Sequence, residues 1–115
     1  MRRVFLLIGS LAGGLAGVVD AATPAPASGE AVYTHWCAPC HAPGPGHPGT
    51  ESLQLKYAGK EPAVLLERKD LTPQIVATFV RQGVLLMAPF RKTEITDAEL
   101  AALATYIADY HKAHR

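Results

Sequence analysis

The chain has 115 residues, a formal net charge of +1 at pH 7 and 18% charged side chains. This length suits one small domain and excludes a multidomain enzyme. A charge so close to balance gives no sign of the basic surface on which nucleic-acid binding depends, so we expect no nucleic-acid partner.

The first residues have the layout of a secretory signal peptide. Two arginines precede an apolar run from Val4 to Val19, and small residues follow at Ala21 and Ala22. The run is shorter than the ~20 apolar residues of a membrane-spanning helix. We therefore predict export to the periplasm, removal of residues 1–22 and no stable membrane insertion afterwards. Retention of the segment as an anchor is the alternative.

Residues 23–27 form a flexible Pro/Ala lead, and 28–115 are assigned to one domain. A domain of about 90 residues buries a modest core and often needs a metal, a disulfide or a bound group for stability. Ser28 is the expected N-cap of a first helix that continues to Cys37. One face of that helix would carry Val32, His35 and Trp36.

The middle of the chain is predicted to be mainly loop. Proline and glycine are frequent from Pro43 to Gly49, and one short helix is expected at Pro62–Glu67. No stretch alternates apolar and polar residues as a strand does for more than a few residues. Long loops in a small domain usually surround something functional.

A helix is predicted after Thr72, its N-cap, with Pro73 in the first helical position and Gly83 as the stop. Leu71 and Val76 can pack together as a hydrophobic staple at its start. Its apolar side comprises Ile75, Val76, Phe79 and Val80.

The last helix is predicted from Asp97 to about Lys112. Thr96 and Glu99 have the spacing of a capping box, and Ile95 and Leu100 have that of a staple. The buried face would comprise Leu100, Leu103, Tyr106, Ile107 and Tyr110. The predicted fold class is therefore all-α.

Both cysteines of the chain lie in the sequence CAPCH, as Cys37 and Cys40, and His41 follows them. This pattern is the attachment signature of c-type haem, in which each thiol adds to a vinyl group and the histidine coordinates iron. Two intervening residues let both sulfurs reach the porphyrin edge from one helical turn. The motif predicts one covalent haem c with His41 as the proximal ligand.

The motif allows three other interpretations. A disulfide between Cys37 and Cys40 would close a very small loop and stabilise the fold little. A thioredoxin-type dithiol, which would make the chain a thiol oxidoreductase, belongs in a βαβ context that the sequence does not predict. A zinc site needs four ligands, and no second cysteine pair is present.

Met87 is the predicted distal iron ligand. It is the single methionine outside the signal segment, follows a helix stop and has Pro89 nearby. A thioether ligand raises the reduction potential of haem iron. A core-filling role is the alternative for this residue. The other histidines, weaker candidates for this position, are His35, His47, His111 and His114.

A ligating histidine usually donates its second ring N–H to an acceptor, which fixes its tautomer. The rigid PGHPG loop after the motif can supply a backbone carbonyl, and we assign that acceptor to Pro48. The alternative is that these residues only turn the chain.

With these features in order, residues 28 to 110 resemble a class I cytochrome c. The resemblance implies that the first and last helices cross, with Gly29, Tyr33, Leu103 and Tyr106 at the contact. It also implies an electron-transfer function rather than catalysis by the chain alone. One departure is Ala88, since the family commonly has proline directly after the methionine.

The C-terminal half is similar to the cytochrome subunits of flavocytochromes that oxidise 4-alkylphenols. That likeness implies a flavoprotein (FAD) dehydrogenase partner, which would remove electrons from the substrate and pass them to the haem. The alternatives are a freely diffusing carrier that supplies a terminal oxidase or reductase, and a haem sensor with an open iron site. We expect docking at an apolar patch: Ala38, Pro39, Leu86, Ala88 and Phe90. Basic residues would rim this patch and either steer a partner or reach the haem propionates, with an ordinary solvated surface as the alternative: Arg68, Lys69, Arg91 and Lys92.

Overall fold

The computed structural model describes residues 25–114, without the side chain of His111. The predicted signal peptide therefore lies outside the described residues. The helices are α1 (Gly29–Val32), α2 (Ala38–His41), α3 (Pro48–Tyr57), α4 (Pro73–Gln82) and α5 (Asp97–Ala113), with a π-helical turn at Tyr33–Cys37 and a 3₁₀ turn at Leu65–Glu67. The described residues contain no strand, which confirms the all-α prediction. None of their helices has both the length and the apolar character needed to cross a membrane.

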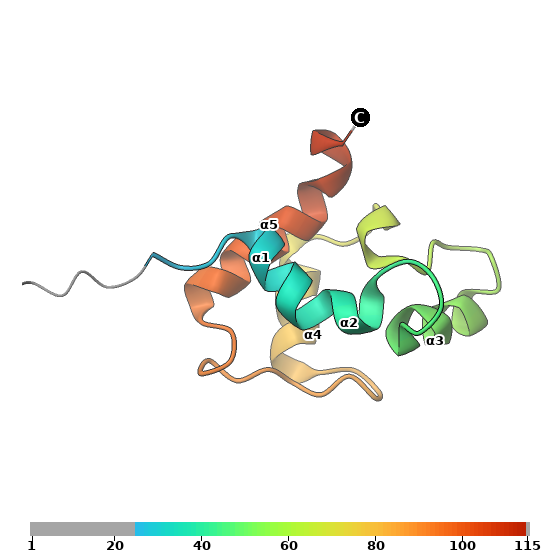
Figure 1. Cartoon of the computed structure of the whole chain (residues 1–115), viewed down its shortest axis with the longest axis horizontal. Helices are drawn as coiled ribbons and strands as arrows, with labels where there is room; N and C mark the ends of the chain where they lie inside the picture. The colour runs from blue at the N-terminus through green and yellow to red at the C-terminus, as the bar shows by residue number, and fades with distance from the viewer. Residues whose placement is uncertain (1–24, 115) are drawn as a thin grey trace, which may run out of the picture.

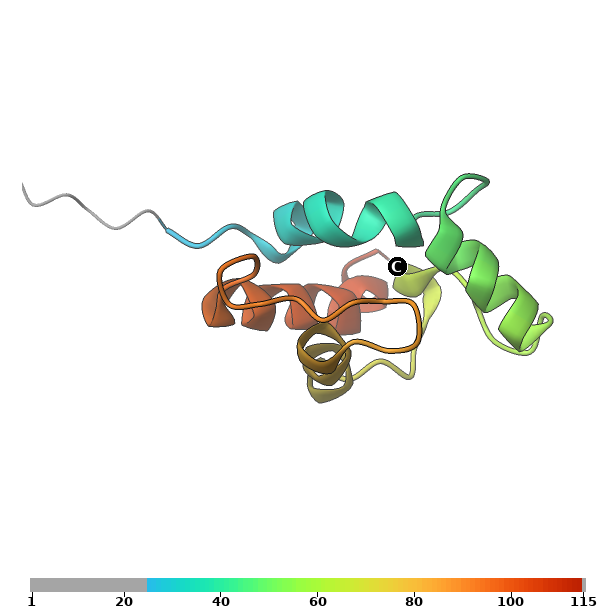
Figure 2. The ribbon, with the colours of Figure 1, turned by 90° about the horizontal axis from the view of Figure 1, so that it is seen from below.

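Helix α5 is the centre of the fold, and α1 and α4 pack on two of its sides (Figure 1, Figure 2). The crossing with α1 is close because Gly29 has no side chain. A Cβ at this position would lie 2.2 Å from the Ala102 carbonyl oxygen. Beside it, the Tyr33 and Tyr106 rings lie 5.8 Å apart. The predicted crossing of the first and last helices is confirmed.

The first helical segment differs from the expected regular α-helix. Ser28 caps it as predicted, with Oγ 3.2 Å from the Ala31 nitrogen. The Ala38 N–H then bonds to the Tyr33 carbonyl, five residues back, which is the bond of a π turn. This wider turn places Tyr33 and Cys37 in the core and leaves His35 exposed. Of the three residues predicted on one face, Val32 is buried and Trp36 is half-buried, whereas His35 is exposed.

Helix α3 was not predicted, because the sequence there shows no apolar stripe. Its Leu55 is 85% exposed, and Thr50 is its one buried residue. Pro48 in the first helical position was the available sequence signal. The expected helix at Pro62–Glu67 is reduced to the 3₁₀ turn, since Val64 has an extended backbone.

Helices α4 and α5 have the predicted starts. The Thr72 hydroxyl accepts from the Ile75 N–H at 3.3 Å, and both bonds of the Thr96–Glu99 capping box are present. The residues of both staples are buried in one core cluster together with Val80, Leu103 and Ile107: Leu71, Val76, Ile95 and Leu100. Ile75 and Phe79, which we predicted on the apolar side of α4, are instead exposed. Each cap satisfies backbone N–H groups that would otherwise lack partners.

Candidate haem site

The two cysteines lie at the end of the first helical segment in different surroundings. Cys37 is buried, Cys40 is exposed, and both are free thiols. Burial, and then the nearby Cys40, raise the pKa of the Cys37 thiol to about 12. A catalytic dithiol requires a lowered pKa, so the environment of Cys37 argues against a thiol oxidoreductase.

The His41 imidazole rests on the backbone of Gly49. A Cβ at Gly49 would lie 2.7 Å from His41 Cε1 and 2.9 Å from Nδ1, so only glycine leaves room for the ring. Nδ1 is buried on this edge without a hydrogen-bond partner among the described residues, which leaves Nε2 as the nitrogen on the open side. Burial lowers the pKa of His41 and keeps the ring neutral near pH 7, the form that binds a metal.

The hydrogen bond that we predicted between His41 and the Pro48 carbonyl is not formed. Pro48 is the first residue of α3, and carbonyls within a helix point along its axis. Pro48 instead starts the helix that carries Gly49 to the His41 ring. Its effect on the site is therefore indirect.

Three side chains bond to the backbone where α2 ends. The Tyr33 hydroxyl donates to the His41 carbonyl at 3.3 Å, and the Thr50 hydroxyl donates to the Ala42 carbonyl at 2.9 Å. The His47 Nδ1 lies 3.0 Å from the Pro39 carbonyl oxygen. Sequence analysis missed Thr50, and assigned Tyr33 only to the helix contact, because no spacing rule predicts which carbonyl a polar side chain reaches.

Met87 lies on a tight turn after α4. Its N–H and carbonyl both pair with Val84, at 2.9 Å in each direction. The two residues at the tip, Leu85 and Leu86, are 90% and 98% exposed, and Leu85 has a φ of 52°. The Met87 side chain is half-buried and packs against the core cluster. Both ribbon views show this turn at the same end of the molecule as the end of α2 (Figure 1, Figure 2).

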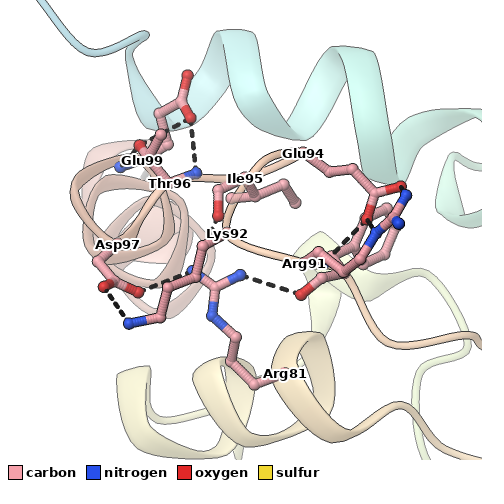
Figure 3. Close-up of polar contacts among 9 residues, drawn as sticks. Arg81, Arg91, Lys92, Glu94, Ile95, Thr96, Asp97 and Glu99 are labelled. Carbon is pink, nitrogen blue, oxygen red and sulfur yellow. Dashed lines mark hydrogen bonds and ion pairs between the residues drawn. The ribbon is translucent and has the colours of Figure 1, made fainter.

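The segment that follows Met87 is fixed to α4. The Phe90 N–H bonds to the Val80 carbonyl at 2.8 Å. The Arg81 guanidinium donates to the Phe90 carbonyl at 3.1 Å and the Ile95 carbonyl at 2.8 Å, and it pairs with Asp97 (Figure 3). The position of Met87 is therefore fixed by hydrogen bonds to its own backbone and to the backbone of the residues that follow it.

The remaining histidines have other partners. His35 is exposed and lies edge-on to the Trp36 ring at 4.7 Å, and His114 stacks on Tyr110 at 4.0 Å. The side chain of His111 is outside the description. No group of three or more His, Cys, Asp or Glu side chains that could hold a metal ion occurs in the described part of the chain, which gives a zinc site no support there.

The basic residues expected around the docking surface differ in exposure and in their ion-pair partners. Arg68 is largely buried, with a side chain 11% exposed that pairs with Asp70 and donates to the Tyr57 hydroxyl, so its placement on an exposed rim was wrong. Arg91 pairs with Glu94, and Lys92 pairs with Asp97 (Figure 3). Lys69 is exposed. Paired surface charges give this region little net field.

These features fit a covalently bound haem. The motif offers two free thiols, a neutral imidazole with an open Nε2, and a thioether on a turn near the same end of the fold. A helical domain of this kind, with crossed terminal helices and a CAPCH segment at a helix end, defines a cytochrome c.

The family comparison agrees with this class. The family model described as cytochrome c oxidase, cbb3-type, subunit III matches residues 24–107, most of the chain, and the chain belongs to that family. It is accordingly an electron-transfer protein of cytochrome c type with covalently bound haem c. No curated protein and no solved structure gives a significant match.

Proposed function

We propose that the chain is a periplasmic one-electron carrier with a single haem c. In this proposal Cys37 and Cys40 would hold the haem through thioether bonds, and His41 and Met87 would coordinate its iron. The observation that carries the proposal is the packing of the His41 ring on Gly49, which buries Nδ1 in a motif whose two thiols are both free.

Haem c supplies an iron that alternates between the ferric and ferrous states. The chain's own residues set the conditions for that change. His41 stays neutral because it is buried, and Met87 offers a soft sulfur that favours the ferrous state.

Partners would dock on an apolar surface that we name the docking patch: Ala38, Pro39, Leu86, Ala88 and Phe90. Leu86 is 98% exposed, and Phe90 packs edge-on against Trp36 at 5.6 Å. Because Arg91 and Lys92 are already paired with acidic neighbours, apolar contact rather than long-range charge would hold the partner.

We propose that the partner is a flavoprotein (FAD) dehydrogenase that acts on 4-alkylphenols. The support is the similarity of the C-terminal half to the cytochrome subunits of such flavocytochromes. The second candidate is a carrier that supplies or belongs to a terminal oxidase, which the description of the matching family favours. Gel filtration of the native complex separates the two, since flavin absorbance that stays with the haem band supports the first.

The absorption spectrum of protein matured in a host that attaches haem c tests the main proposal. We expect a Soret band that stays with the polypeptide after acid–acetone extraction, and a ferrous spectrum of a low-spin iron with methionine and histidine ligands. A colourless protein would contradict the proposal.

A further inference from the structure

We propose that Tyr33, His47 and Thr50 are positioning residues that fix His41 for iron binding. The inference rests on the proposed role of His41 as proximal ligand. The three side chains bond to the carbonyls of His41, Pro39 and Ala42 respectively, and in each pair the two residues are eight positions apart. Tyr33 precedes α2 in the sequence, whereas His47 and Thr50 follow it.

The end of a helix leaves its last carbonyl groups without intrahelical partners. α2 has only four residues, and the Ala42 N–H already bonds to the Ala38 carbonyl at 3.0 Å. It is the last turn of a continuous helical segment, residues 29–41, and the chain leaves the helix at Ala42, whose backbone is extended. The backbone that bears His41 therefore depends on side-chain donors for its geometry.

Thr50 is fully buried, with no exposed surface. Its loss would leave the part-buried Ala42 carbonyl without its donor, which is unfavourable. Tyr33 is also buried, and burial, followed by the charges of Cys37 and of two tyrosines, raises its pKa to about 12. The phenol thus remains a donor throughout the neutral range.

His47 can only donate to the Pro39 carbonyl, so its Nδ1 must carry a proton. Pro39 lies between the two cysteines, and this bond therefore holds the part of the motif that sets the spacing of the sulfurs. A second contact fixes the same loop, since the Gly46 N–H donates to the Glu51 carboxylate at 2.9 Å.

Together with the Gly49 backbone against the ring, these bonds restrict both the position and the rotation of the imidazole. A ligand held in its binding geometry loses less entropy when it binds. The expected consequence is a stronger bond from His41 to iron than the motif alone would give.

The test compares Tyr33→Phe, His47→Ala and Thr50→Val with two conservative variants, His47→Gln and Thr50→Ser, which keep a donor. Nitric oxide bound on the distal side of the ferrous haem weakens the bond opposite to it. The ratio of five- to six-coordinate nitrosyl species therefore reports how firmly His41 is held. The reduction potential is measured on the same samples.

Thr96→Ala is the control, because it removes the α5 cap and lowers stability without touching α2. We expect each disruptive variant to raise the five-coordinate ratio by about fivefold to tenfold, the change that one buried hydrogen bond supports. The conservative variants should restore much of the wild-type value, and the control should match the wild type.

Wild-type ratios and potentials in all three disruptive variants would overturn the inference, as would an equal change in Thr96→Ala. If Thr50→Val fails to fold, Tyr33→Phe and His47→Ala decide the matter. A wild-type protein without a Soret band contradicts the proposed function itself and, with it, this inference. If the wild-type protein binds haem but the three disruptive variants behave like it, the inference is wrong and the proposed function stands.

Discussion

The two regions that carry the proposed iron ligands are built in different ways. His41 ends a helical segment whose last carbonyls bond to three side chains, and its ring rests on Gly49. Met87 lies on a turn closed by its own backbone pair with Val84. In the proximal region the contacts are made to His41 and its immediate backbone. In the distal region they are made mainly by the residues around Met87, not by its side chain.

This difference indicates which of the two proposed iron ligands an added ligand can replace. The tip of the Met87 turn is almost fully exposed, and Leu85 has a positive φ that costs a leucine roughly 1–2 kcal/mol. Segments of low local stability open most readily. We therefore expect added ligands to replace Met87 and to leave His41 bound.

The largest expected effect follows from Met87→Ala. The thioether bonds and His41 remain, so the haem should stay attached. The reduction potential should fall by a sizeable part of the roughly 0.8 V range that axial ligands span. Redox titration and the ferric spectrum measure the change. An unaltered potential and spectrum would show that Met87 is not a ligand and that the distal region is misassigned.

Gly49→Ala tests the proximal region. The new methyl group would lie 2.7 Å from His41 Cε1, too close for any non-bonded contact, so the ring or α3 must move. We expect a loss of about 1–3 kcal/mol in stability, as overpacking usually costs, and a larger five-coordinate nitrosyl ratio. Denaturant unfolding and nitrosyl spectra provide the measurements. A variant identical to the wild type in both would contradict the packing of His41 on Gly49.

Gly83→Ala is the matching change on the distal side. Gly83 has a φ of 70°, and a Cβ there would lie 2.5 Å from the Met87 carbonyl oxygen. We expect displacement of the turn and several-fold tighter carbon monoxide binding, with no change in the nitrosyl ratio. If Gly83→Ala altered the proximal bond as much as Gly49→Ala does, the two regions would not be independent.

Thr96→Ala measures stability apart from either ligand. Loss of the capping box should lower the free energy of unfolding by about 1 kcal/mol while the reduction potential stays constant. Chemical denaturation and redox titration of the same sample check this. A shifted potential would mean that α5 is coupled to the haem environment.

Leu85→Asn is expected to change stability and reduction potential the least. Asparagine adopts positive φ more readily than leucine, so stability should rise by less than about 1 kcal/mol. The potential should not change, whereas affinity for a redox partner should fall if the exposed tip contributes to docking. Binding assays with Leu86→Asn as the parallel variant separate docking from strain. Undiminished affinity in both would place docking elsewhere.

Much of the fold followed from local signals. The caps at Ser28, Thr72 and Thr96 were predicted because a capping side chain bonds to an N–H only two or three residues away. α3 was missed because its sequence has no apolar face, and the π turn was missed because its wider register depends on what Tyr33 packs against. Both depend on neighbours that are distant in sequence.

The candidate site divides in the same way. The spacing of Cys37, Cys40 and His41 within one helical turn was enough to predict covalent haem attachment from local sequence. Met87 and the caps could also be chosen from the sequence alone. Only the tertiary structure decided which carbonyls Tyr33, His47 and Thr50 reach, and that the His41 ring rests on Gly49 rather than bonding to Pro48. A hydrogen bond between residues on either side of a loop forms only once the loop has folded. The spacing of residues within one helical turn, in contrast, depends only on the local backbone.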